Sequence, residues 1–226
     1  MDDVAPVRTA LTSRRSVRGY LDDPVPRGVV EDILLAAGRA PSGTNIQPWR
    51  VWVLEGAAKD ALVDLVTAEF DAGRTEGLGD YYPSEFVEPY LSRRRKVGWD
   101  LYGLLGIQRG EWDKSRAYHR RNFEFFGAPV GLVFAMHETM RSGGWMDLGL
   151  YMQGVMTMAR AHGLHTCPQA AWLEYKDLVG AHLGLPEGYH VVAGMSLGYE
   201  DPDAEINRLF TERVPLEEFV TFVGEG

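Results

Sequence analysis

The segment from residue 147 to 162 is the strongest constraint that the sequence places on the fold. Apolar side chains recur along it at helical spacing, and its remaining positions carry almost no charge. A surface helix has an apolar stripe and a charged opposite face, so a helix this apolar must be covered on most of its sides. We expect it at the centre of the fold or against a second subunit. Its stripe comprises Leu148, Tyr151, Met152, Val155, Met156 and Ala159.

Further helices and strands are predicted around this segment. Residues 27–38 and 57–70 have the apolar periodicity of amphipathic helices. Three short apolar runs, at residues 50–54, 129–136 and 190–197, predict buried strands. Long intervals separate these strands, which favours an α+β layer arrangement over an all-β sandwich. Because no repeat, low-complexity tract or linker divides the chain, we expect one domain over residues 1–226.

Charge and cysteine content exclude several classes of protein. The 23 basic and 32 acidic residues give a net charge of −9, which argues against a nucleic-acid or anionic-membrane surface. Cys167 is the only cysteine, so the chain has no internal disulfide and no cysteine metal cluster, and we assign no metal. Neither a P-loop nor a strand-linked G-x-G-x-x-G motif occurs. Without a predicted membrane span or signal segment, a cytoplasmic location is expected.

A basic segment, Arg14-Arg15-Ser16-Val17-Arg18, stands out in this acidic chain. If it is extended, Arg14, Ser16 and Arg18 share one side, where guanidinium groups and a hydroxyl can converge on a phosphate or a polyol. Arg15 then points elsewhere or reaches around the edge. A solvated charge run at the end of a helix is the competing interpretation.

A polar turn over residues 40–49 joins the first predicted helix to the first predicted strand. Asn45 and Gln47 stand two residues apart, so an extended backbone presents both carboxamides on one side, each able to donate and accept hydrogen bonds. The pyrimidine edge of a flavin, with carbonyls flanking an N–H, requires that mixed set. An Asx-type turn at Asn45, with Trp49 in the core, explains the same residues without a ligand.

A third candidate segment, residues 166–172, follows the predicted helix terminator Gly163. Its small residues let the backbone approach a flat ligand. Cys167 has only His165 as a nearby base and does not suggest a catalytic triad, so a buried, inert thiol is expected.

Taken together and in this order, these segments resemble the FMN-dependent nitroreductase family. The shared motifs are RRSVRGY, APSGTNIQPWRVWV, WMDLGLYMQGVMTMARAHGL, CPQAAW and the tail GYEDPDAEINRLFTERVPLEEFV. Within the family, the chain is most similar to the nitrobenzoate and nitroaromatic reductases typified by the mycobacterial NAD(P)H nitroreductase. Those proteins carry insertions similar to residues 88–107.

The resemblance implies a nitroreductase-like α+β fold, with a central, mostly antiparallel sheet flanked by helices. It also implies an intertwined homodimer that binds FMN in the subunit interface, with the tail at residues 201–226 embracing the partner subunit. The implied FMN contacts are Arg14, Arg15, Ser16 and Arg18, then Ser42, Asn45 and Gln47 from the other subunit, Pro168, Gln169, Ala170 and Ala171 near the flavin N5, and Arg213 and Arg208 in the tail.

The implied activity is hydride transfer from NADPH or NADH through FMN to a nitroaromatic or quinone-like substrate in a ping-pong cycle. Because the cofactor carries this chemistry, no catalytic side chain is required, and Arg18 is a candidate stabiliser of the reduced flavin. Two alternatives stay open: reductive dehalogenation or other flavin chemistry on the same fold, and flavin storage or binding without catalysis.

Residues 71–127 are interpreted as a lid over this active site. Aromatic rings there could stack on a flat substrate, and the basic run at residues 93–96 could attract a carboxylate or the 2′-phosphate of NADPH. Ordinary packing and a solvated helix face explain the same residues without a function. The candidate substrate-binding residues are Tyr90, Arg93, Trp99 and Tyr102.

Overall fold

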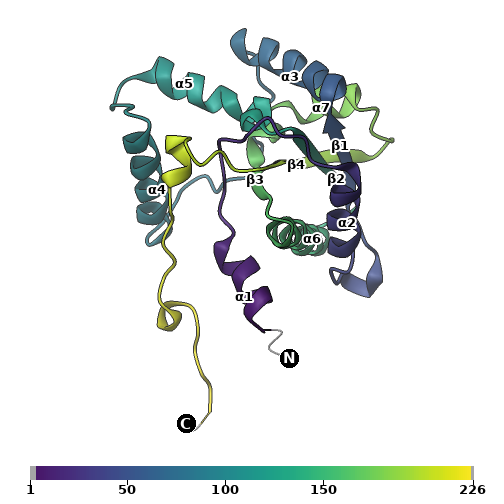
Figure 1. Cartoon of the computed structure of the whole chain (residues 1–226), viewed down its shortest axis with the longest axis vertical. Coiled ribbons are helices and arrows are strands. Elements are labelled where there is room, and N and C mark those ends of the chain that lie inside the picture. Colours follow the sequence, from purple (N-terminus) through teal and green to yellow (C-terminus); the bar gives the residue numbers. More distant parts are fainter. Residues whose placement is uncertain (1–3, 225–226) are drawn as a thin grey trace.

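A four-stranded antiparallel sheet lies at the centre of the computed structural model, which describes residues 4–224 (Figure 1). The strand order is β1-β2-β4-β3. The strands are β1 (Arg50–Glu55), β2 (Val130–His137), β3 (His165–Gln169) and β4 (Tyr189–Gly198). The predicted α+β class and antiparallel sheet are therefore confirmed, as are the three strands expected from their apolar runs.

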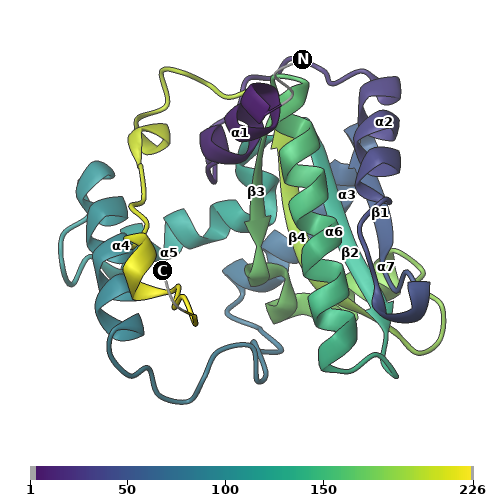
Figure 2. The same cartoon turned by 90° about the horizontal axis from the view of Figure 1, so that it is seen from below.

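Helices cover both faces of the sheet (Figure 2). On one face, α2 and α6 pack side by side, and their buried side chains form one core with β2 and β4. On the other face, a second core joins α3, α7 and the short helices η2 and η3. The α-helices are α1 (Val4–Ser13), α2 (Arg27–Ala37), α3 (Gly56–Asp71), α4 (Tyr90–Leu104), α5 (Trp112–Arg120), α6 (Ser142–Ala161) and α7 (Lys176–His182). The 3-10 helices are η1 (Gly43–Asn45), η2 (Arg121–Gly127), η3 (Ala170–Tyr175), η4 (Glu205–Arg208) and η5 (Leu216–Glu218).

Helix α6 is the central helix that the apolar stripe predicted. Its stripe residues Leu148, Tyr151 and Val155 are buried. The helix begins at Ser142, before the stripe does, and its first three residues, serine and two glycines, carry no periodic apolar signal. Two apolar side chains in the N-terminal half of the helix, Met146 and Leu150, are exposed. No helix within residues 4–224 has the length and apolar character needed to cross a membrane.

Strand β3 was not predicted, because residues 166–172 were interpreted only as a segment of small residues that could approach a flat ligand. The strand is short and contains Pro168, and proline is excluded from central strands because it cannot donate to the hydrogen-bond ladder. Here β3 is an edge strand paired with β4 alone, where the missing N–H costs little. On its outer side, the Val17 N–H donates to the Thr166 carbonyl oxygen at 3.1 Å.

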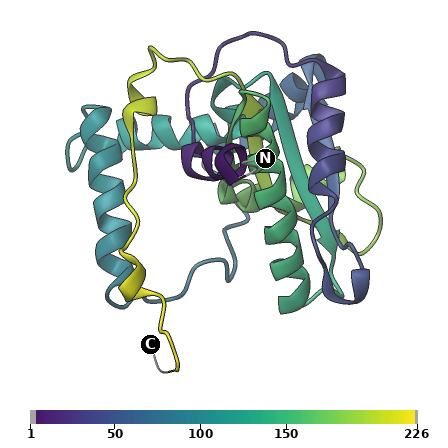
Figure 3. The same cartoon turned by 60° about the horizontal axis from the view of Figure 1, so that its bottom comes forward.

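Helix α4 and the C-terminal tail stand apart from the sheet and its helices (Figures 1 and 3). No residue of α4 is buried. The tail runs along this helix, and the guanidinium of Arg93 donates to the Glu218 carboxylate at 2.9 Å. The last two residues of the predicted tail, 225 and 226, lie outside the described residues.

Candidate functional site

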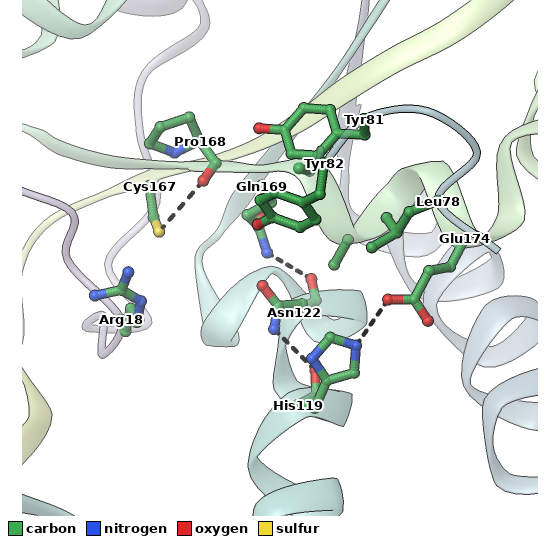
Figure 4. A pocket seen from close by; sticks show the side chains of 12 residues that line it. Arg18, Leu78, Tyr81, Tyr82, His119, Asn122, Cys167, Pro168, Gln169 and Glu174 are labelled. Carbon is green, nitrogen blue, oxygen red and sulfur yellow. Dashed lines mark hydrogen bonds and ion pairs between the residues drawn. The ribbon is translucent and has the colours of Figure 1, made fainter. Parts of the chain in front are cut away.

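A cavity of about 340 Å³ opens between the end of β3, the N-terminal basic segment and the end of α5 (Figure 4). It gathers residues from four separate parts of the chain, so only the complete fold creates it. Its lining comprises Arg18, Leu78, Tyr81, Tyr82, His119, Asn122, Cys167, Pro168, Gln169, Ala170, Ala171 and Glu174.

The basic segment is extended and alternates, as its sequence predicts. Val17 is fully buried in the core, whereas its neighbours Ser16 and Arg18 are half-buried. Ser16 forms a parallel bridge with Thr166 of β3, so the segment runs along the edge of the sheet. This pairing aims Arg18 at the cavity.

The C-terminal tail holds the basic segment in place through hydrogen bonds. The buried side chain of Asn207 accepts a hydrogen bond from the Arg18 N–H at 2.9 Å and donates to the Gly19 carbonyl oxygen at 2.8 Å. Of the basic segment, Arg18 lines the cavity, whereas Arg14, Arg15 and Ser16 do not, and Arg15 pairs with Glu200. Sequence reasoning missed Asn207, because a single asparagine far from the basic segment carries no local signal.

Two arginines from opposite ends of the chain, Arg14 and Arg213, form a positive cluster. Burial lowers the pKa of the Arg14 guanidinium, and the nearby charge of Arg213 lowers it further. Neither arginine pairs with a carboxylate among residues 4–224, and Arg213 instead donates to the Thr211 hydroxyl at 2.9 Å. Two neighbouring cations without a carboxylate partner are suited to binding an anion.

The end of β3 and the start of η3 supply a wall of small residues. Pro168, Ala170 and Ala171 line the cavity, so the backbone there is accessible to a flat ligand. Cys167 is buried, as expected for an inert thiol. Burial raises its pKa despite the nearby charge of Arg18.

The polar and aromatic residues on the far side of the cavity were not predicted as site residues. His119 and Glu174 pair at 3.0 Å between ring Nε2 and carboxylate Oε1. Tyr81 and Tyr82 pack edge to face with their ring centroids 4.7 Å apart. These four residues belong to no sequence motif. Tyr81 and Tyr82 fall within residues 71–127, which were predicted to form a lid partly because of their aromatic content.

The polar turn at residues 40–49 lies outside the cavity, since none of its residues belongs to the lining. The side chain of Ser42 accepts a hydrogen bond from the Gln47 N–H at 3.0 Å, and the Gln47 amide donates to the Asn45 carbonyl oxygen at 3.1 Å. Asn45 and Gln47 both have positive φ values, of 60° and 48°. The buried carboxylate of Asp147 anchors the turn to α6 by accepting from the Gly43 N–H at 3.2 Å.

The four candidate substrate-binding residues, Tyr90, Arg93, Trp99 and Tyr102, all belong to α4 and do not line the cavity of their own chain. Trp99 is 72% exposed. Arg208, in η4, pairs with Glu205 at 3.3 Å.

Comparison with known proteins identifies the family of this chain. The family model described as "Nitroreductase family" matches residues 11–199, most of the chain. This chain belongs to the nitroreductase family. Among curated nitroreductases, a 4-nitrobenzoate reductase of Nocardioides sp. is 44% identical over 214 residues, covering 93% of this chain and 87% of the relative. A chloronitrobenzene nitroreductase of Comamonas testosteroni is 40% identical, with 95% and 96% covered.

Solved nitroreductases share the fold closely. The FMN-dependent nitroreductase NfnB from Mycobacterium smegmatis, in complex with NADPH, superposes with a TM-score of 0.93 at 32% identity, covering 98% of this chain and 99% of that one. The FMN- and NADPH-dependent NfnB from a Sphingopyxis strain has a TM-score of 0.93 at 38% identity, with 97% and 99% covered.

Proposed function

We propose that this nitroreductase is an FMN-dependent enzyme that uses NADPH or NADH to reduce nitroaromatic compounds. Its similarity to 4-nitrobenzoate and chloronitrobenzene reductases supports the substrate class. The structural observation that carries the proposal is the cavity lined by Arg18 and by the small residues Pro168, Ala170 and Ala171. That cavity offers a flat ligand a cation and an accessible backbone.

The residues present fit FMN. Its terminal phosphate requires cations without carboxylate partners, which Arg14 and Arg213 provide. Ser16 and Arg18 follow Arg14 along the same extended segment, where they would contact the ribityl chain and the pyrimidine side of the ring. The small-residue wall at Pro168 to Ala171 would allow backbone contact near N5. When bound, FMN supplies hydride chemistry.

Within this site, the protein binds, orients and neutralises charge. Arg18 faces the cavity and has no carboxylate partner among the described residues, so its full charge is available to offset negative charge on the pyrimidine side. Arg15 acts indirectly, because its pairing with Glu200 fixes the segment that carries the other cations.

We further propose a homodimer in which each cofactor site is completed by the partner subunit. The exposed apolar residues of α6, α1 and the tail include Met146, Leu150, Val7, Phe210 and Phe222, and their burial against a partner would stabilise a dimer. The turn with Ser42, Asn45 and Gln47 lies outside the cavity of its own chain, and its polar groups are exposed at Asn45 and Gln47 and half-buried at Ser42. In the dimer these groups would reach the flavin of the partner subunit.

The lid at residues 71–127 is part of the same proposal. The lid residues that line the cavity of the same chain are Leu78, Tyr81, Tyr82, His119 and Asn122. The exposed face of α4, with Tyr90, Trp99 and Tyr102, would cover the site of the partner subunit, because no contact within its own chain buries it.

An anaerobic titration tests the function directly. The purified protein is expected to be yellow, to lose its colour with NADPH and to regain it with a nitroarene such as 4-nitrobenzoate. Bleaching without nitroarene turnover would instead favour flavin storage, and a colourless protein that does not take up added FMN would contradict the cofactor assignment.

A further inference from the structure

The pair formed by His119 and Glu174 lies on the cavity wall and has no part in the cofactor site described above (Figure 4). Glu174 Oε1 lies 3.0 Å from His119 Nε2. The Glu174 side chain is 17% exposed and that of His119 is 43% exposed. The carboxylate is therefore largely buried, while the imidazole contacts both the cavity and solvent.

A hydrogen-bond chain connects His119 to the small-residue wall. The Asn122 amide donates to the His119 carbonyl oxygen at 2.9 Å, and the Gln169 amide donates to the Asn122 carbonyl oxygen at 2.6 Å. The imidazole also packs against Phe70 and Phe123, with ring centroids 5.8 and 5.7 Å away. These contacts hold the ring in a fixed position relative to the end of β3.

Each nitro group reduced to a nitroso group consumes one proton from outside the reductant. The balance is ArNO₂ + NADPH + H⁺ → ArNO + NADP⁺ + H₂O. NADPH supplies two electrons and one hydrogen, one N–O bond breaks, and the departing oxygen leaves as water. The proton in this balance needs a donor that reaches both the cavity and solvent.

We propose that His119, oriented by Glu174, is the acid that protonates the departing nitro oxygen. Nε2 is held by Glu174, and Nδ1 has no hydrogen-bond partner among residues 4–224, so the protonated ring can donate from Nδ1 and regain a proton from solvent. Glu174 is a positioning residue, because its carboxylate holds the ring at Nε2. This inference rests on the proposed reduction of nitroarenes.

Other charged and titratable groups surround the imidazole. Asp71 of α3 is paired with Arg120 and contributes little net charge. Arg116 lies on the same helix, and Arg18, Tyr81 and Tyr82 line the cavity. Glu174 is thus the anion directly bonded to the ring, which makes it the residue to vary.

The test compares two electron acceptors on the FMN-loaded protein with NADPH. Nitrobenzene requires a proton at the site, whereas ferricyanide accepts one electron and no proton. His119→Asn is expected to lower nitrobenzene turnover by about 10- to 100-fold and to leave FMN content and ferricyanide reduction unchanged. The matched control is His162→Asn, because His162 forms the same kind of pair with Asp32, at 2.8 Å, away from the cavity.

Two further measurements separate an acid from a structural residue. Glu174→Gln should lower nitrobenzene turnover and leave ferricyanide reduction unchanged, because it removes the carboxylate that holds the ring at Nε2. Without NADPH, added nitrobenzene should shift the NMR resonances of the His119 imidazole and not those of His162. Equal losses with both acceptors, or unchanged nitrobenzene turnover in His119→Asn, would overturn the proposal. A wild-type protein that reduces ferricyanide but not nitrobenzene would overturn the proposed function itself.

Discussion

Arg14 and Arg213 come from opposite ends of the chain, yet the charge of one reduces the basicity of the other. Burial is the larger cause of the lowered pKa of Arg14, and the proximity of Arg213 adds to it. Such repulsion costs free energy in the unliganded protein. A bound dianion removes that cost, so the cluster should contribute strongly to FMN affinity.

Replacing either arginine by alanine should therefore weaken FMN binding about 10- to 100-fold, corresponding to about 1.5–3 kcal/mol for one charge-assisted contact. Fluorescence titration of the apoprotein with FMN measures this. Arg8→Ala is the control, because Arg8 is an exposed arginine of α1. Unchanged affinity in both Arg14→Ala and Arg213→Ala would remove these residues from the phosphate site.

Truncation after Leu209 should convert the protein to a monomer. It removes exposed apolar side chains including Phe210, Phe219 and Phe222, whose burial against a partner we expect to stabilise the dimer. The truncated chain keeps Asn207 and thus the hydrogen bonds that hold the basic segment. Light scattering gives the mass in solution, and a truncated protein that remains dimeric would contradict the proposed role of the tail.

Stability should fall as the pH drops from about 6.5 towards 4. Burial, with the charges of Arg160 and Arg15, lowers the pKa of His165 from 6.5 to about 4. Below pH 6.5 the unfolded chain protonates this residue while the folded chain does not, so the unfolded state binds more protons and gains stability. We expect a loss of about 1–2 kcal/mol by pH 4.5.

Urea unfolding at pH 7.5, 6.5, 5.5 and 4.5 measures this dependence. His165→Gln keeps a polar side chain next to Glu200 but cannot titrate, so its free energy of unfolding should depend less on pH than that of the wild type. Parallel profiles for the two proteins would rule out His165 as the cause.

Gly194→Ala should destabilise the protein by several kcal/mol. Gly194 lies opposite Gln169 in the sheet, and a Cβ there would lie 2.2 Å from Cδ1 of the fully buried Trp172. The indole is enclosed by the core and cannot move away. In Gly28→Ala the new methyl meets nothing within 4 Å, so this helical control should be neutral or stabilising in thermal unfolding.

Arg93→Ala should raise KM for 4-nitrobenzoate more than for uncharged nitrobenzene, if α4 covers a site and attracts the carboxylate. Its ion pair with Glu218 offsets part of the charge, so we expect about a threefold rather than a larger effect. Lys96→Ala is the control, because Lys96 pairs with Asp100 on the same helix. Equal KM changes for both substrates would assign Arg93 to the attachment of the tail alone.

The parts of the fold that the sequence predicts are those with a repeated local signal. The stripe of α6, the periodicity of α2 and α3 and the apolar runs of three strands each repeat often enough to define an element. The alternation of Ser16, Val17 and Arg18 likewise follows from one buried residue between two polar ones. Strand β3 lacks such a signal, since it is short and contains a proline.

The cavity was predictable only in part, because its residues meet through tertiary contacts. Arg18 and the wall at Pro168 to Ala171 belong to motifs and were expected there. His119, Asn122 and Glu174 are single polar residues of different elements, brought together by the packing of α5 and η2 against η3. No residue spacing in the sequence predicts that these three side chains meet.

The basic segment also covers part of the sheet edge formed by β3, which limits how that edge can pair with a strand of another molecule. At β3 the Val17 N–H already occupies the Thr166 carbonyl oxygen, and Pro168 offers no N–H of its own. An intruding strand would find few free backbone groups there, so this edge is protected against intermolecular β-pairing and aggregation.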